Sequence, residues 1–495
     1  MNTALFIICL FLVVSIVLGL LAKRGKDMGM EQWAVGGRGF GGVFVFLLLA
    51  GETYSVFTLL GTSGLAFNNG AAAFYLLAFT ALGTITSYWI LPPIWRYAKE
   101  NNVVSQSQFF SKKYNSKGLG VFVAIVGVVA LIPYITILFK SMGILVAATS
   151  YGAIPSTAAI WVGMIALLVY VMVSGIHGSA WTSTVKDFLI FFVILFLGIY
   201  LPFHYFGGIG GLFHAVNEVK PHALTLPAKG LSVPWFISTV AISAFAYFMW
   251  PHNAPTIYAS KNEKAFRLNA VLLPIYALMV LFVYFVGFTA MVELPGLEKG
   301  DLALLELSIK TFDPWFVGII GATGLLATLV PGSMMLMSAA TMITTNVIEP
   351  LKSDISDKSK AVTAKGFVVV LSILCAFFSM SDSSTLATLY LTSFSLITQM
   401  APSLYLSLRK KNNITKYGSG MGMFIGVAIV VYVTFTKTTM AGLFPTLPST
   451  IQDLNIGIIA LAANIVVMFT VSFFTKKSLV SGEKGGENLP SAKVI

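Results

Sequence analysis

Residues 51–64 read Gly51-Glu52-Thr53-Tyr54-Ser55-Val56-Phe57-Thr58-Leu59-Leu60-Gly61-Thr62-Ser63-Gly64, inside the apolar run 43–67. That run is long enough to cross a bilayer, which takes about 20 apolar residues. Yet the stretch holds three glycines, one carboxylate and five Ser or Thr residues. Non-helical backbone at membrane depth is tolerated only inside protein or beside a water-filled cavity, and a charge there costs about 2.5–3.5 kcal/mol. The stretch therefore predicts a broken helix that forms part of a binding site.

The composition is that of a polytopic membrane protein. Of 495 residues, 57% are hydrophobic and only 10% are charged, against about 25% charged in soluble domains. Cys9 and Cys375 both lie in apolar runs, so neither a disulfide framework nor a cysteine metal site is expected.

Thirteen apolar runs of spanning length divide the chain, and an odd number places the two ends on opposite sides. The runs are approximately 3–22, 41–67, 72–96, 118–147, 157–176, 185–206, 233–250, 269–292, 315–347, 366–381, 385–408, 418–436 and 455–475.

The basic residues separate the loops into two classes. With the N-terminus outside, the cytoplasmic loops carry 25 Lys and Arg residues and the external loops carry five, which satisfies the positive-inside rule. We expect a multi-pass plasma-membrane protein with a cytoplasmic C-terminus. The net charge of +12 then reflects topology, and no nucleic-acid partner is expected. Lys186 and Asp187, at the start of run 185–206, are predicted to form an ion pair at the cytoplasmic face.

A second interruption is predicted in the stretch 245–255, which contains Pro251 and Pro255. Each proline removes a backbone donor, so the helix must kink or end there; an ordinary helix end at the cytoplasmic surface is the simpler interpretation. The stretch lies five runs after the first interruption, so the two helices cross in opposite directions. Paired interruptions in two inverted halves are typical of the binding site of a secondary transporter.

The ninth run, 315–347, is rich in small and hydroxyl-bearing residues around Pro331. Close helix packing through small residues is one interpretation. The other is a cation site, because a proline beside Thr328 and Ser333 frees carbonyl oxygens for an ion such as Na+.

Glu52 is the most informative single residue, because intramembrane ionisable groups are functional by default. It can take up a proton for coupling or pair with a cation, or it can be a structural hydrogen-bond partner. The histidines show no ligand spacing, and no paired acids or nucleophile–base arrangement is present. We therefore expect no enzymatic activity, no cofactor and no catalytic residues.

Four motifs in order resemble the sodium:solute symporter family, which includes proline and pantothenate permeases and sodium/sugar cotransporters. The resemblance covers about residues 33–410. The matching segments are Trp33–Arg38, Leu60–Gly64, Tyr247–His252 with Ala259–Lys261, and Ser338–Ile348. The resemblance implies an all-α polytopic fold of about 13 transmembrane helices, with a five-plus-five inverted-repeat core containing broken helices.

The resemblance also implies a sodium site made by the backbone oxygens of Gly51, Tyr54 and Ala327. The two hydroxyl ligands of the family fall on Val330 and Pro331 here, so Thr328 or Ser333 would have to substitute. With Glu52 at a normally uncharged position, this departure leaves Na+ and H+ open as the coupling ion, and no other metal is expected. Residues with a proton-coupling or substrate role are Glu52, Ser55, Tyr247, His252 and Gln399.

These expectations combine into a symporter that imports a small organic solute with a cation by alternating access. The Val-Pro pair is similar to the branch of the family associated with monocarboxylate uptake, so the solute is a monocarboxylate or an amino-acid-like metabolite. A channel or facilitator without ion coupling is the alternative. The expected organisation is a flanking helix and loop (1–40), the transporter core (41–408), two flanking helices (409–480) and a flexible cytoplasmic tail (481–495).

Overall fold

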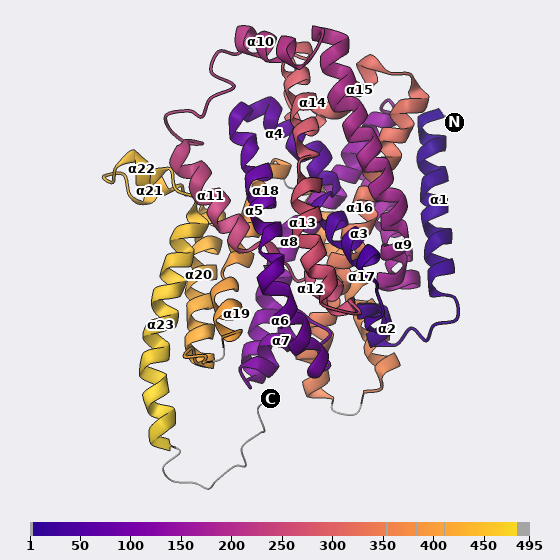
Figure 1. The fold of residues 1–495 in the computed structure, drawn as a ribbon. Coiled ribbons are helices and arrows are strands. Elements are labelled where there is room, and N and C mark those ends of the chain that lie inside the picture. Colours follow the sequence, from indigo (N-terminus) through magenta and orange to yellow (C-terminus); the bar gives the residue numbers. More distant parts are fainter. Residues whose placement is uncertain (1–2, 353–354, 382–383, 410, 483–495) are drawn as a thin grey trace.

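The computed structural model describes residues 3–352, 355–381, 384–409 and 411–482. All regular elements in these residues are helices (Figure 1), so the predicted all-α membrane fold is confirmed. The expected tail, 481–495, lies outside the described residues from position 483 onward.

The first half of the chain contains these helices: α1 Thr3–Lys23, α2 Met30–Val35, η1 Gly36–Arg38, α3 Gly42–Thr53, η2 Phe57–Gly61, α4 Thr62–Asn69, η3 Gly70–Phe74, α5 Tyr75–Ile85, α6 Ser87–Glu100, α7 Gln106–Lys113, α8 Lys117–Thr149, α9 Ser156–Phe206 and α10 Ile209–Val219. The second half contains α11 Val233–Phe245, η4 Tyr247–Met249, α12 Asn253–Ala259, α13 Lys264–Ala277, α14 Val280–Glu293, η5 Gly300–Leu302, α15 Ala303–Thr311, α16 Pro314–Ile343, η6 Thr344–Ile348, η7 Glu349–Leu351, α17 Asp357–Ser381, α18 Leu386–Thr398, α19 Ala401–Ser407, α20 Lys416–Thr436, α21 Met440–Leu443, α22 Ser449–Gln452 and α23 Ile456–Gly482.

The first broken helix is α3, which ends at Thr53 and resumes as η2 at Phe57. Tyr54 leaves the helical conformation with φ −104° and ψ 74°. The amide of Thr58, which would donate to Tyr54 in a regular helix, instead donates to the carbonyl of Ser55 over 3.0 Å. The break therefore releases backbone carbonyls in the middle of an apolar run.

The second broken helix is α11, which ends at Phe245 and is followed by the short η4 turn. Trp250 is extended, with φ −60° and ψ 127°, and α12 begins at Asn253. Both interruptions predicted from the sequence are therefore present in the fold.

The two breaks also explain why the count of thirteen spans is not confirmed. Among the described residues, ten helices are long and apolar enough to cross a membrane. The helical pieces α3 and α11, of 12 and 13 residues, are too short to span alone, because about 20 residues are needed. The run 385–408 is likewise divided into α18 and α19.

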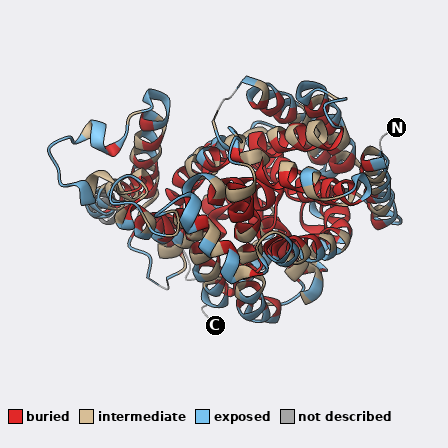
Figure 2. Cartoon of the chain, turned by 90° about the horizontal axis from the view of Figure 1, so that it is seen from above, coloured by how far each residue is buried: buried red, intermediate tan, exposed pale blue. Residues whose placement is uncertain are grey.

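The core is built around α16, which is buried along nearly its whole length. It packs against α1, α8, α9 and α17 and touches α3. Seen from above, the buried residues gather in the centre of the helices (Figure 2). The helices α20 and α23 pack mainly on each other at one flank of this body (Figure 1).

A short backbone connection joins the segments next to the two broken helices. The amide of Phe40, just before α3, donates to the carbonyl of Ala259 over 2.9 Å. The amide of Lys261, just after α12, donates to the carbonyl of Phe40 over 2.8 Å. The indole of Trp95 adds a 2.8 Å hydrogen bond to the carbonyl of Ser260.

One sequence-based boundary is wrong, with a consequence for the site. The segment 177–186 is not a cytoplasmic loop, because helix α9 kinks at Gly175 and then continues to Phe206. Two of its hydroxyls bond to carbonyls one turn earlier: Ser183 donates to the carbonyl of Ser179 over 2.7 Å and Ser179 to the carbonyl of Gly175 over 3.3 Å. Lys186 therefore lies eleven residues inside this second half of α9 and is fully buried, not at a membrane surface.

Gly175 is required at the kink because its backbone has φ 52° and ψ −149°. A Cβ there would lie 2.6 Å from the Trp33 ring and 2.7 Å from the Trp33 carbonyl oxygen. We expect Gly175→Ala to cost about 1–3 kcal/mol from the backbone conformation, in addition to the clash, and to lower the Tm of the purified protein. The matched control is Gly366→Ala on α17, where a Cβ has no atom within 4 Å. Equal Tm values for the two variants would contradict this account of the kink.

Candidate functional site

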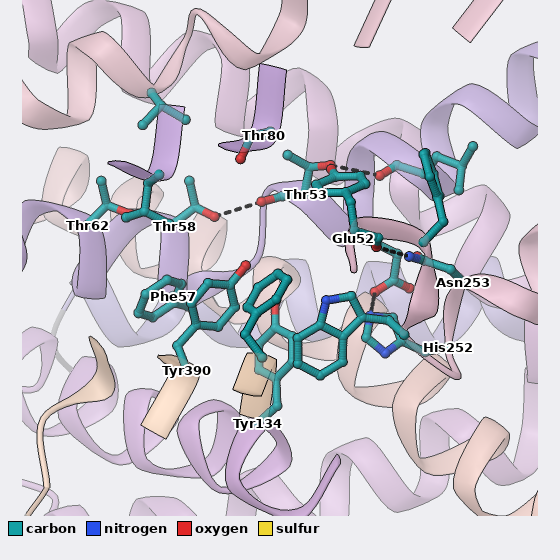
Figure 3. Close-up of a pocket in the computed structure, with 17 residues that line it drawn as sticks. Glu52, Thr53, Phe57, Thr58, Thr62, Thr80, Tyr134, His252, Asn253 and Tyr390 are labelled. Atoms are coloured by element: carbon teal, nitrogen blue, oxygen red, sulfur yellow. Dashed lines mark hydrogen bonds and ion pairs between the residues drawn. The ribbon is translucent and has the colours of Figure 1, made fainter. Parts of the chain in front are cut away.

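A cavity lies between the two broken helices, with side chains from both pointing into it (Figure 3). Segments far apart in sequence meet there: the break in α3, the turn after α11, and the helices α5, α8 and α18. The lining residues are Leu49, Glu52, Thr53, Phe57, Thr58, Thr62, Leu76, Thr80, Tyr134, Tyr247, Phe248, Trp250, His252, Asn253, Val280, Tyr390 and Phe394.

Glu52 and His252 form the charged end of the cavity. Glu52 Oε2 lies 3.1 Å from His252 Nε2, and the two side chains are 5% and 2% exposed. Among the described residues, Glu52 Oε1 and His252 Nδ1 have no hydrogen-bond partner. Buried polar atoms are ordinarily hydrogen-bonded, so these two atoms have capacity for a bound molecule or a further proton.

Aromatic rings form one wall of the cavity (Figure 3). Tyr390 stacks on Phe57 with ring centroids 4.1 Å apart, and Tyr134 contacts the Tyr390 ring edge-to-face at 5.3 Å. Trp250 lies between Tyr134, at 5.1 Å, and Phe394, at 4.9 Å. Ligand sites commonly combine such an apolar wall with a few convergent polar groups.

Hydroxyl groups form the opposite side. Thr53 and Tyr247 share a 2.6 Å hydrogen bond between their hydroxyls. Thr58 donates over 2.8 Å to the carbonyl of Thr53. The first bond links α3 to the turn after α11, so the two interrupted segments contact each other through side chains as well as through the cavity.

The structure brings three of the predicted proton-coupling or substrate residues together, since Glu52, Tyr247 and His252 all line the cavity. A fourth, Ser55, contacts it indirectly through a 3.3 Å hydrogen bond to the Tyr134 hydroxyl. Gln399 does not line it: its amide donates to the carbonyl of Ser395 over 3.0 Å and accepts from Asn464 over 3.2 Å. Gln399 thus joins the end of α18 to α23.

The predicted cation residues lie beside the cavity, where the carbonyls of Gly51 and Tyr54 both face Lys186. Ala327, Thr328 and Ser333 are buried on α16. The hydroxyl of Thr328 donates to the carbonyl of Gly324 over 2.9 Å. Ser333 Oγ lies 2.7 Å from the carbonyl of Val330 and 2.6 Å from Ser179 Oγ.

Sequence reasoning missed several residues of the site. Tyr134 and Tyr390 lie in long apolar runs that contain other aromatic residues, a pattern equally typical of core packing, so no sequence signal identifies them. Trp250 lies within the interrupted stretch and could have been selected for that reason. The burial of Lys186 is not predictable in this way, because the polar residues before it have the composition of a loop.

Two broken membrane helices that meet at a polar and aromatic cavity define a secondary transporter. The comparisons with known proteins identify its kind: the model of the sodium:solute symporter family matches residues 33–426. The chain belongs to the sodium:solute symporter family. It is thus a multi-pass membrane transporter of a family of symporters rather than enzymes.

Two relatives match nearly the whole chain. The uncharacterized symporter YhjB of Bacillus subtilis is 52% identical, covering 97% of this chain and 98% of its own length. A monocarboxylate transport permease protein of Rhizobium johnstonii is 28% identical, covering 95% and 96%. A solved structure of a Na+-coupled sialic acid symporter, in a substrate-bound outward-open state, is 15% identical with a TM-score of 0.78, covering 96% of this chain and 98% of that one. This last likeness concerns the fold.

The Glu52–His252 contact predicts non-additive effects of substitution. Removing one member of a buried pair leaves the other unpaired, which costs about 3–5 kcal/mol. We expect Glu52→Gln and His252→Gln each to lower the Tm, and the double variant to lose less than the sum of the two. The coupling should be of the order of 1 kcal/mol. The control is Glu218→Gln, at an exposed position on α10, whose effect on stability should simply add to that of His252→Gln. If the effects of Glu52→Gln and His252→Gln also add strictly, Glu52 and His252 are not coupled.

Proposed function

We propose that this protein imports a small organic solute together with a coupling cation, by alternating access across the plasma membrane. The solute is a monocarboxylate or an amino-acid-like metabolite. The N-terminus is external and the C-terminus cytoplasmic, as the distribution of basic residues indicates. The name of the Rhizobium relative, a monocarboxylate transport permease protein, supports this class of solute.

The observation that carries the proposal is the buried Glu52–His252 pair at the junction of both broken helices. The pair is electrically neutral when it holds one proton, with either a carboxylate beside an imidazolium or a carboxylic acid beside an imidazole. A solute carboxylate can accept a hydrogen bond from His252, while the apolar part of a small metabolite fits against the aromatic wall. The free atoms of the pair are those that would contact such a solute.

Charge balance explains why solute and cation would move together. An anionic solute entering a neutral, buried site leaves one uncompensated negative charge, which is costly to bury unless paired. A cation that enters with it, whether Na+ or a second proton on the pair, restores neutrality. The family makes sodium the expected coupling ion, and the carboxyl group of Glu52 makes a proton the alternative.

A channel or facilitator also needs a polar pathway, so the cavity alone does not distinguish it from a coupled symporter. Accumulation of the solute does. A coupled symporter concentrates solute against its gradient, because the cation moves down its own concentration gradient, and a tenfold gradient releases about 1.4 kcal/mol. A facilitator only equalises concentrations.

The test is uptake of radiolabelled pyruvate, acetate and proline into proteoliposomes, with the sodium and proton gradients imposed separately. We expect accumulation of at least one of these solutes above equilibrium under one of the gradients. Glu52→Gln should abolish accumulation, since it removes a charge that the site needs for balance, while Glu218→Gln should retain it. Equilibration without accumulation under every gradient would show a facilitator, and accumulation that survives Glu52→Gln would remove Glu52 from the mechanism.

A further inference from the structure

Lys186 is a fully buried lysine that the function proposed above does not use. Its side chain is 0% exposed and projects from the second half of α9 to the break in α3. Lys186 Nζ lies 3.3 Å from the carbonyl oxygens of Gly51 and Tyr54 and 2.5 Å from Asp187 Oδ1. An ammonium has three donors, and three oxygens surround this one.

The local structure is shaped to admit the ammonium. The break in α3 releases the carbonyl of Tyr54, because the Thr58 amide donates to Ser55 instead. A Cβ on Gly51 would lie 3.1 Å from Lys186 Nζ, tighter than ordinary van der Waals contact. Glycine at this position therefore permits the close approach of the lysine.

The same two carbonyls are the ones that the family resemblance assigns to sodium. Where the family has two hydroxyl ligands, this chain has Val330 and Pro331, neither of which has a side-chain oxygen. The hydroxyls of Thr328 and Ser333 are within 2.9 Å of carbonyl oxygens of α16 itself. Compared with the sodium site that the resemblance implies, this region keeps the two backbone carbonyls, lacks the side-chain oxygen ligands, and holds the ammonium of Lys186.

We propose that the ammonium of Lys186 is the resident cation of this site, occupying the position between the break of α3 and the neighbouring helices, so that transport proceeds without sodium. This inference rests on the proposed symport function and names its coupling ion as the proton. A coupled transporter that does not use sodium needs another cation, and the buried titratable groups of this region can carry one.

The charges around Lys186 support this assignment. Asp187 on the same helix forms the ion pair, and Glu52 on α3 follows Gly51, whose carbonyl accepts from Lys186. On α13, the Tyr276 carbonyl accepts from the Tyr54 hydroxyl over 2.6 Å. Helix α16 contributes no charged residue. The ammonium is paired with Asp187 and Glu52 with His252, so a sodium ion at the Gly51 and Tyr54 carbonyls would lie beside the ammonium and meet like-charge repulsion from it.

The first measurement is the Tm of the purified wild-type protein in NaCl and in choline chloride at equal ionic strength. Ligands that bind the folded state increase its free energy of unfolding by RT ln(1 + [L]/Kd) and so raise the Tm. We expect no saturable difference between the two salts for wild type. Lys186→Ala should have a lower Tm and should be stabilised by methylammonium chloride relative to choline chloride, because a small free ammonium can enter the space. The control, Lys358→Ala, removes a surface lysine that is 76% exposed and should show neither effect.

The second measurement is uptake of whichever solute the wild type accumulates, with the proton gradient held constant and sodium replaced by choline. We expect the initial rate to change by less than about twofold, which corresponds to about 0.4 kcal/mol. A saturable sodium effect on wild-type Tm or uptake would overturn the inference, even if Lys186→Ala fails to fold. If none of the solutes is transported but the Tm results are as expected, the proposed function fails and the assignment of Lys186 stands.

Discussion

The structure depends on how the carbonyls freed by the break in α3 are satisfied inside an apolar bundle. In lipid such groups cannot turn to water, so an interrupted helix persists only if the protein supplies a partner. Here the partner is Lys186, which reaches Gly51 and Tyr54 from α9. The ion pair with Asp187 compensates the ammonium in turn. Three features therefore depend on one another: the break in α3, the Lys186–Asp187 pair, and the kink at Gly175, after which the half of α9 that carries Lys186 begins.

The contacts that hold the end of α3 also position the residues of the neighbouring cavity. Glu52 is one residue beyond Gly51, so whatever holds the end of α3 also fixes the direction of the Glu52 carboxylate toward His252. The hydrogen bond between Thr53 and Tyr247 secures the other side of the break. The carbonyl that Lys186 reaches and the carboxylate that contacts His252 therefore belong to adjacent residues of one helix end.

Much of the fold could be predicted from the sequence because its signals are local. Glu52 in an apolar run, and Pro251 with Pro255 near the end of another, mark the two interruptions directly. The helix α9 could not be predicted in the same way, because the polar residues 177–186 have the composition of a loop. In the folded chain, the hydroxyls of Ser179 and Ser183 bond to carbonyls one turn earlier. Contacts such as Tyr134 with Tyr390 depend on tertiary packing alone, which no residue pattern records.

The backbone connection between Phe40 and the end of α12 constrains how the molecule can move. Two hydrogen bonds, of 2.9 and 2.8 Å, join the start of one interrupted helix to the end of the other. These two ends cannot separate without breaking both hydrogen bonds. Any opening of the bundle that keeps these two bonds must therefore move both helix ends together.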